Sequence, residues 1–198
     1  MDLKISQTTQ ATYPPRTAIN AKSSDLTVAI AVDFTSRGEE ITKKLAGENY
    51  LAIHIDENPL DAARNLYREL RKRNARTLNV AGNSIVTFAE YGWTQEMINE
   101  RTYAIVAKVH EHWTIEFLRS GGQTGTDLAG GVAAVALGIP AEMTFPAGLL
   151  QRHDAKKDTT HTEQEIIEQV MAGVNALQKN GMEVIPAKSM KNQHRPGR

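Results

Sequence analysis

Apolar residues gather in five short runs along the chain, separated by polar segments with helical spacing. The first run, Leu26–Val32, is continuous and rich in β-branched residues, which is typical of a strand buried on both faces of a parallel sheet. The other runs predict four more strands, at 50–55, 77–81, 114–118 and 141–145.

The segments between these runs carry helix signals. Asn58 and Pro59 form a cap followed by a proline at the first helical position, and apolar side chains then recur at helical spacing as far as Arg73. Similar signals predict helices over 36–47, 94–109, 127–138 and 162–179.

Strands that alternate with helices predict right-handed βαβ units. We therefore expect an α/β fold, a three-layer Rossmann-like domain with a mostly parallel sheet of about five strands. We expect the domain to span residues 25–180, between a flexible N-terminal arm at 1–24 and a basic C-terminal tail at 181–198. In such sheets ligands bind at the carboxyl ends of the strands.

Composition narrows the function classes. The 198 residues contain no cysteine, which excludes disulfides, thiolate metal sites and a cysteine nucleophile. Lys and Arg number 23 and so do Asp and Glu, so the chain has no basic footprint for nucleic acid. No apolar run approaches the length of about 20 residues that spans a bilayer. We expect a cytoplasmic protein with no membrane and no nucleic-acid partner.

The segment from Ser120 to Asp127 is the strongest chemical signal. Its three glycines, Gly121, Gly122 and Gly125, lie between a predicted strand and a predicted helix. Glycine permits positive φ and close backbone approach, and a helix start points free N–H groups at an anion. The spacing matches neither a Walker loop nor a GxGxxG fingerprint. The whole segment is a predicted binding site: Ser120, Gly121, Gly122, Gln123, Thr124, Gly125, Thr126 and Asp127.

Asp127 has two interpretations. It lies in the first helical turn, where a carboxylate complements the helix dipole, or it accepts hydrogen bonds from sugar hydroxyls or acts as an acid or base. It is therefore the one candidate catalytic residue. Arg119 either pairs with a ligand anion or lies exposed at a strand end.

Other loops at the same predicted edge add candidates. Gly82, Asn83 and Ser84 follow the third strand, and either hold a second edge of the ligand or form an ordinary turn. Pro146 and Arg152 follow the fifth strand, and Asp33 and Arg37 follow the first as secondary candidates. His153 and His161 share a polar loop without metal-ligand spacing, so no metal site is expected.

Two motifs resemble the SLOG superfamily: Ala81-Gly82-Asn83 after one strand and Ser120–Asp127 after a later one. That superfamily includes the lysine-decarboxylase-like (LOG) phosphoribohydrolases, DNA-processing protein A and TRPM-channel sensor domains. The string GGQTGTD looks most like the molybdenum-cofactor-carrier-like branch, and proteins similar to this one occur in phages and prophages. The similarity covers residues 77–152.

The resemblance implies a small-molecule partner, a nucleotide or nucleotide-derived ligand over the glycine-rich loop, with a molybdenum-cofactor-like ligand as one form of it. LOG enzymes carry PGGxGTxxE, in which the glutamate helps to cleave an N-glycosidic bond. Here Ser120 replaces the proline and no glutamate follows in the first helical turn. A sensor, carrier or sequestering protein is therefore expected, with a hydrolase of an N-glycosidic or phosphate bond as the alternative. We also expect a homo-oligomer, because small sheets of this class often pair through their helices.

Overall fold

A computed structural model of the chain describes residues 2–153 and 157–184. The first half contains β1 (Leu3–Gln7), α1 (Tyr13–Lys22), β2 (Leu26–Ala31), α2 (Arg37–Ala46), the 3₁₀ turn η1 (Gly47–Asn49), β3 (Tyr50–His54), α3 (Pro59–Arg73), β4 (Thr77–Gly82) and α4 (Ile85–Ala89). The second half contains α5 (Gln95–His110), β5 (Phe117–Gly121), α6 (Thr126–Leu137), β6 (Ala141–Phe145), β7 (Gln151–Arg152), β8 (Asp158–Thr159) and α7 (Glu163–Lys179).

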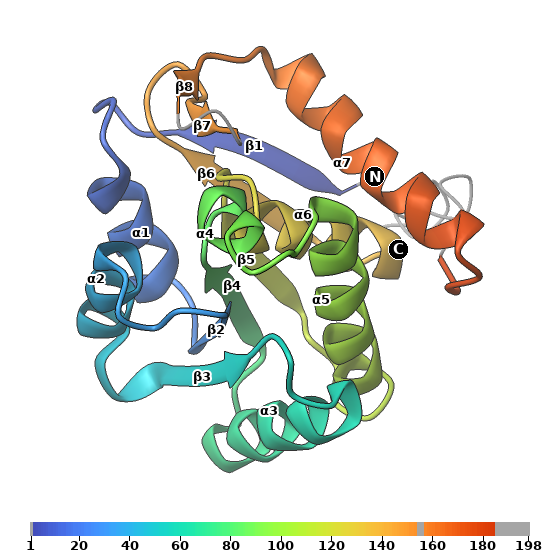
Figure 1. Ribbon diagram of the computed structural model, residues 1–198. Helices are drawn as coiled ribbons and strands as arrows, with labels where there is room; N and C mark the ends of the chain where they lie inside the picture. Colours follow the sequence, from blue (N-terminus) through green and yellow to red (C-terminus); the bar gives the residue numbers. More distant parts are fainter. Residues whose placement is uncertain (1, 154–156, 185–198) are drawn as a thin grey trace, which may run out of the picture.

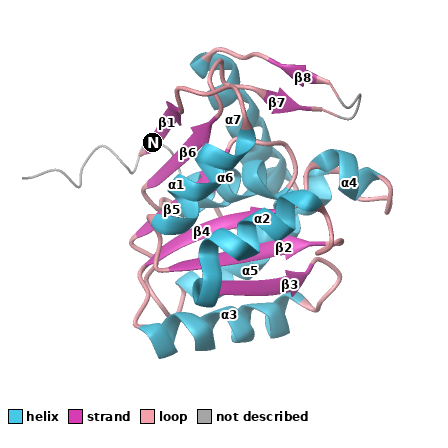
Figure 2. Cartoon of the chain, turned by 90° about the vertical axis from the view of Figure 1, so that its left-hand side faces the viewer, coloured by secondary structure: helices cyan, strands magenta, loops and turns pink. Residues whose placement is uncertain are grey.

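Six strands form one parallel sheet in the order β1-β6-β5-β4-β2-β3, and β7 and β8 form a small antiparallel ribbon. Helices α1 and α2 pack together on one face of the sheet, and α3, α5, α6 and α7 lie on the other face (Figures 1 and 2). The Rossmann-like α/β fold is therefore confirmed. The strand order changes direction between β2 and β4. The connection that leaves β2 leads to β3 on one side, and the connection that leaves β4 leads to β5 on the other.

The five predicted strands correspond in order to β2, β3, β4, β5 and β6 of the sheet, whereas the short β7 and β8, which also lie within residues 25–180, were not predicted. The fourth strand is displaced: it runs over Phe117–Gly121 rather than 114–118. Thr114 and Ile115 form the approach to the strand, where the Ile115 N–H donates to His110 Nδ1 at 3.1 Å. Ser120 and Gly121 therefore belong to the strand, and the loop before α6 is shorter than expected.

The prediction of a flexible arm at 1–24 is wrong. Residues Leu3–Gln7 are the sixth strand of the sheet, paired in parallel with β6, and Tyr13–Lys22 form α1. Pro14 and Pro15 lie in the first turn of α1, where a missing N–H costs no helical hydrogen bond. The arm was expected because the buried face of α1 carries Arg16 and Asn20 in place of apolar side chains.

The two faces of the sheet differ in chemistry. Leu78 and Val80 of β4 point to the side of the main hydrophobic core, whereas Asn79 and Ala81 line a cavity instead. On the core side α6 is buried over nearly its full length. Small and polar side chains therefore leave open space beneath α1 and α2, and this space forms the site.

Two further expectations concern the chain as a whole. Residues 185–198, which make up most of the predicted basic tail, lie outside the described residues. Across residues 2–153 and 157–184 no helix has the length and apolar character that a bilayer crossing requires.

Candidate functional site

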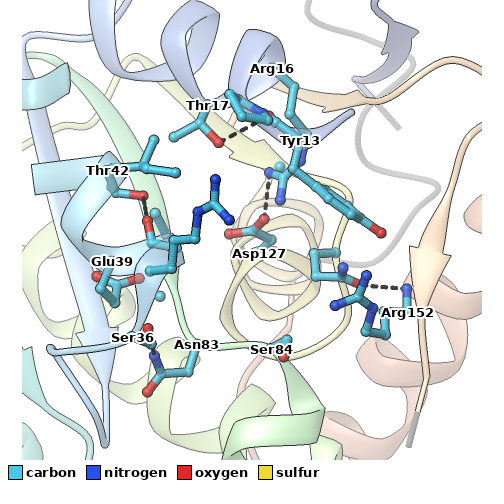
Figure 3. Close-up of a pocket in the computed structure, with 18 of the residues that line it drawn as sticks. Tyr13, Arg16, Thr17, Ser36, Glu39, Thr42, Asn83, Ser84, Asp127 and Arg152 are labelled. Atoms are coloured by element: carbon cyan, nitrogen blue, oxygen red, sulfur yellow. Dashed lines mark hydrogen bonds and ion pairs between the residues drawn. The ribbon is translucent and has the colours of Figure 1, made fainter. Parts of the chain in front are cut away.

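A cavity of about 670 Å³ opens at the carboxyl ends of the parallel strands and extends beneath α1 and α2 (Figure 3). It lies beside the ends of β2 and β4, where the connections that follow these two neighbouring strands leave in opposite directions. This is the usual ligand position in an open α/β sheet. Five segments line the cavity: α1 with the residues before it, the first turns of α2, β4 with the turn after it, the glycine-rich segment as far as Asp127, and the β7–β8 ribbon.

An ion pair between Arg16 and Asp127 lies in the middle of the cavity wall (Figure 3). Arg16 Nη1 donates to Asp127 Oδ2 at 2.7 Å, and the two side chains are only 10% and 7% exposed. Burial raises the pKa of the Asp127 carboxyl, and the Arg16 charge and the Gln123 N–H act against that rise. Arg16 Nε, also buried, has no partner among the described residues.

The start of α6 is occupied by the protein itself. The Thr126 N–H donates to the Asn83 carbonyl at 3.2 Å, and the Leu128 N–H donates to the Gln123 carbonyl at 3.0 Å. The Asp127 carboxylate accepts from the Gln123 N–H in the same turn. The anion at this helix start is therefore the protein's own Asp127 carboxylate.

Gly125 is fixed between two elements. It caps α6 with φ at +94°, a conformation that side chains rarely adopt, and an added Cβ would overlap the Asn83 carbonyl. Gln95 at the start of α5 accepts from the Gly125 N–H at 2.6 Å and donates to its carbonyl at 2.9 Å. Gly125 therefore shapes the loop from behind and does not line the cavity.

Asn83 joins the loop after β4 to the loop after β2. Its Oδ1 accepts from the N–H groups of Val32 and Asp33 at 2.9 and 2.8 Å, and its Nδ2 donates to the Asp33 carbonyl at 2.8 Å. The hydrogen bonds of its amide therefore hold together the two loops that follow β2 and β4. The neighbouring Ser84 hydroxyl has no hydrogen bond to the described part of the chain.

Glu39 is a buried carboxyl in the cavity wall, on the first turn of α2 (Figure 3). It is 2% exposed, and the Tyr50 hydroxyl donates to its Oε2 at 3.2 Å. Burial raises its pKa to about 7, with smaller upward contributions from the charges of Asp127 and Asp33. No cation pairs with it among the described residues. It can therefore hold or release a proton near neutral pH.

Two arginines lie at the mouth of the cavity. Arg37 begins α2, is exposed, and has no ion pair or hydrogen bond to the residues that the structure describes. Arg152 pairs with Asp158 at 2.9 Å, and Tyr13 also donates to Asp158 at 2.9 Å. Arg37 therefore keeps its full charge available for an anionic ligand, and Arg152 keeps less.

The predicted site residues divide into two groups. The cavity is lined by Gly82, Asn83, Ser84, Gly121, Gln123, Asp127, Arg152 and Arg37. The remaining candidates are absent from its lining: Arg119, Ser120, Gly122, Thr124, Gly125, Thr126, Pro146 and Asp33.

Contacts elsewhere explain several of these absences. Arg119 pairs with Glu142 of β6 at 2.5 Å, and its Nε donates to the Ser23 carbonyl at 3.2 Å. Thr126 Oγ1 donates to the Ile30 carbonyl at 2.7 Å, and Thr124 Oγ1 donates to the Arg152 carbonyl. The Asp33 carboxylate accepts from the Thr35 hydroxyl at 2.7 Å and from the Thr35 N–H at 2.8 Å, and these bonds lower its pKa.

Sequence reasoning missed Arg16, Asn20, Glu39 and Asn79 as site residues. Arg16 and Asn20 fell in the supposed arm, and Glu39 and Asn79 resemble ordinary positions of a surface helix and a strand. A buried polar residue on a helix carries no periodic signal by itself. Within the described ranges no three His, Asp or Glu side chains come together as a metal site.

Comparison with protein families settles the relationship. Residues 2–107 match the model of the circularly permutated YpsA SLOG family. The chain belongs to this family. No curated protein matches the chain, and no solved structure matches it.

The SLOG superfamily suggested by the glycine-rich motif is thereby confirmed, whereas the molybdenum-cofactor-carrier-like branch is not. The matched residues of this circularly permutated YpsA SLOG protein run from β1 into α5 and end before the glycine-rich segment. They include Arg16, Glu39 and Asn83 of the cavity.

Proposed function

We propose that the protein binds a nucleotide or nucleotide-derived ligand in the cavity beneath α1 and α2. SLOG membership suggests nucleotide-related ligand binding in general. The observation that carries the proposal is the unpaired Arg37, which lies in the first turn of α2 and lines the cavity. A helix start with an adjacent arginine favours a phosphate group.

The orientation of the ligand follows from the charges. The phosphate contacts Arg37, the first turn of α2, which the Ser36 side chain does not cap, and the free Ser84 hydroxyl at the mouth. The sugar lies over Gly121 and Asp127, because a carboxylate repels phosphate and accepts hydroxyl hydrogen bonds. The protein is then a sensor, carrier or sequestering protein for that ligand.

Calorimetric titration with AMP, GMP, CMP and UMP tests this proposal. Arg37→Ala should weaken the tightest of these interactions about tenfold, since a charge-assisted hydrogen bond contributes roughly 1.5–3 kcal/mol. Arg64→Ala is the matched control, because Arg64 is exposed on α3 and pairs with Asp61 at 2.8 Å on the other face of the sheet. Binding by none of the four nucleotides, or equal affinity in Arg37→Ala, would reject the proposal.

Glu39 favours a second candidate, hydrolysis of an N-glycosidic bond. A buried carboxyl that is protonated near neutral pH can donate a proton to the departing base while water adds to the sugar carbon. Glu39 then recovers a proton from that water. Chromatography of incubated nucleotides should show free base with the parent protein, much less with Glu39→Gln, and an unchanged amount with Glu40→Gln on the exposed side of α2. If all nucleotides stay intact with the parent protein, hydrolysis is rejected and only the proposal of binding stands.

Two finer expectations join the proposal. The ligand class includes cofactors built on a phosphorylated heterocycle, such as the molybdenum cofactor, for which the GGQTGTD string is the support. The protein is also proposed to form a homo-oligomer, which light scattering of the purified protein measures directly.

A further inference from the structure

The cavity has an inner end, away from its mouth and beneath α1 and α2. Asn79 lies on β4, four residues before Asn83, and four residues of extended chain span about 13 Å. Asn20 follows Tyr13 by seven residues on α1, which is about 10 Å along a helix. All four residues line the same cavity, so it extends well inward from the strand ends.

Both inner asparagines have unsatisfied side chains. Each is 2% exposed, and neither Oδ1 has a hydrogen-bond partner among the described residues. Asn79 Nδ2 donates to Thr27 Oγ1 at 3.2 Å, whereas no described residue bonds to either atom of the Asn20 amide. Buried polar atoms without partners are unfavourable, so these two Oδ1 atoms in one cavity lining point to a group that enters and pairs with them.

The charges around the inner end exclude a phosphate there. Arg16 is the cation of this part of the cavity lining, and Asp127 already neutralises it. Glu39 adds a second carboxyl to the same wall, and Arg37 lies at the mouth. The entering group is therefore neutral and polar, and the small side chain of Ala81 leaves room for it.

We propose that this inner end is the subsite for the heterocyclic base of the ligand. The base enters between α1, α2 and β4, its edge pairs with the Asn20 and Asn79 amides, and the phosphate stays at the mouth. An asparagine amide offers one acceptor and one donor side by side, which matches the mixed edge of a nucleobase. The inference rests on the proposed function, because it assumes that the ligand is a nucleotide.

Ordered water bound to both amides is the competing explanation, because buried polar cavities commonly hold water. A ligand without a base separates the two. The parent protein should bind its preferred nucleotide among AMP, GMP, CMP and UMP at least about tenfold more tightly than ribose 5-phosphate, a difference that one buried hydrogen-bonded group supplies. Calorimetric titration measures all five ligands under one condition.

Two variants locate that difference. Asn20→Leu and Asn79→Leu should each lower affinity for the nucleotide about tenfold and leave affinity for ribose 5-phosphate within about twofold. Thr102→Val is the matched control: Thr102 is fully buried on α5 with an unpartnered Oγ1, but lies on the other face of the sheet. Its affinity for both ligands should equal that of the parent. If Asn79→Leu does not fold, Asn20→Leu and the parent comparison still decide.

The outcomes distinguish the two levels of inference. If no nucleotide binds, the proposed function fails and the base subsite fails with it. If nucleotide and ribose 5-phosphate bind equally to the parent, the proposed function stands and the base subsite is rejected. The subsite is also rejected if both leucine variants keep the parent affinities, as the water explanation requires, or if they weaken both ligands equally.

Discussion

Arg16 of α1 and Asp127 of α6 form a buried ion pair, 2.7 Å long, between helices that lie 111 residues apart in the chain and on opposite faces of the sheet. The pair passes the carboxyl end of β5, where Gly121 has no side chain to block it. It joins the first helix of the chain to the glycine-rich segment, so residues remote in sequence meet in the cavity wall.

The pair should contribute strongly to stability. Arg16→Met leaves the Asp127 carboxylate buried without its cation, which typically costs about 3–5 kcal/mol in the free energy of unfolding. Lys4→Met is the control, because Lys4 pairs with Glu142 at 2.9 Å but is itself 71% exposed, and such pairs contribute less than about 1 kcal/mol. Urea denaturation measures both, and equal losses would contradict a buried role for Arg16.

Gly121 should tolerate no side chain. The Cβ of Gly121→Ala would overlap Arg16 Nη1 and Asp127 Oδ2 and force the two charges apart. We expect a loss of stability similar to that of Arg16→Met, about 3 kcal/mol or more. In contrast, Gly38→Ala on α2 meets open space and should change stability by about 1 kcal/mol at most. Thermal unfolding of the two variants, side by side with the parent, checks this difference.

Glu39 should make stability depend on pH. Its pKa is about 7 in the folded protein and 4.5 ordinarily, so the folded state holds the proton more tightly. Stability is therefore fully present below pH 4.5 and is lost as the pH rises through 7. The loss amounts to about 3 kcal/mol at 1.36 kcal/mol per pKa unit.

Glu39→Gln removes that titration. The parent should become less stable relative to the variant between pH 5 and pH 8, by roughly 2–3 kcal/mol when urea denaturation is run at both pH values. The exposed neighbour Glu40→Gln should keep the parent's pH dependence. A parent and a Glu39→Gln variant with parallel pH profiles would show that Glu39 titrates normally.

Removal of residues 2–24 should disrupt folding. The deletion takes away β1, which pairs with β6 over five residues, and α1, which covers one face of the sheet. We expect loss of a cooperative thermal transition, monitored by circular dichroism. An unchanged midpoint would instead fit the flexible arm that the sequence suggested.

The sequence by itself determined the layers of the fold. Apolar β-rich runs such as Leu26–Ala31 and the cap and proline at Asn58 and Pro59 report local preferences, which the tertiary structure did not need to override. The glycine-rich segment also identified the superfamily. Gly125 has a positive φ, and this requirement for glycine is set by the local backbone. Because β2 is buried on both faces, its residues form a continuous apolar run that predicts a strand without reference to the neighbouring strands.

Only the tertiary structure decided where the cavity lies and which side chains face it. Arg16 and Asn20 make the inner face of α1 polar, so the hydrophobic periodicity that marks a buried helix is absent. Glu39 and Asn79 acquire their properties from desolvation and from partners remote in sequence, such as Tyr50 and Thr27. The start of α6 was expected to face an anion, and the anion there is the buried Asp127 carboxylate held by Arg16. That arrangement depends on the packing of α1 against the sheet, because only packing brings Arg16 to Asp127.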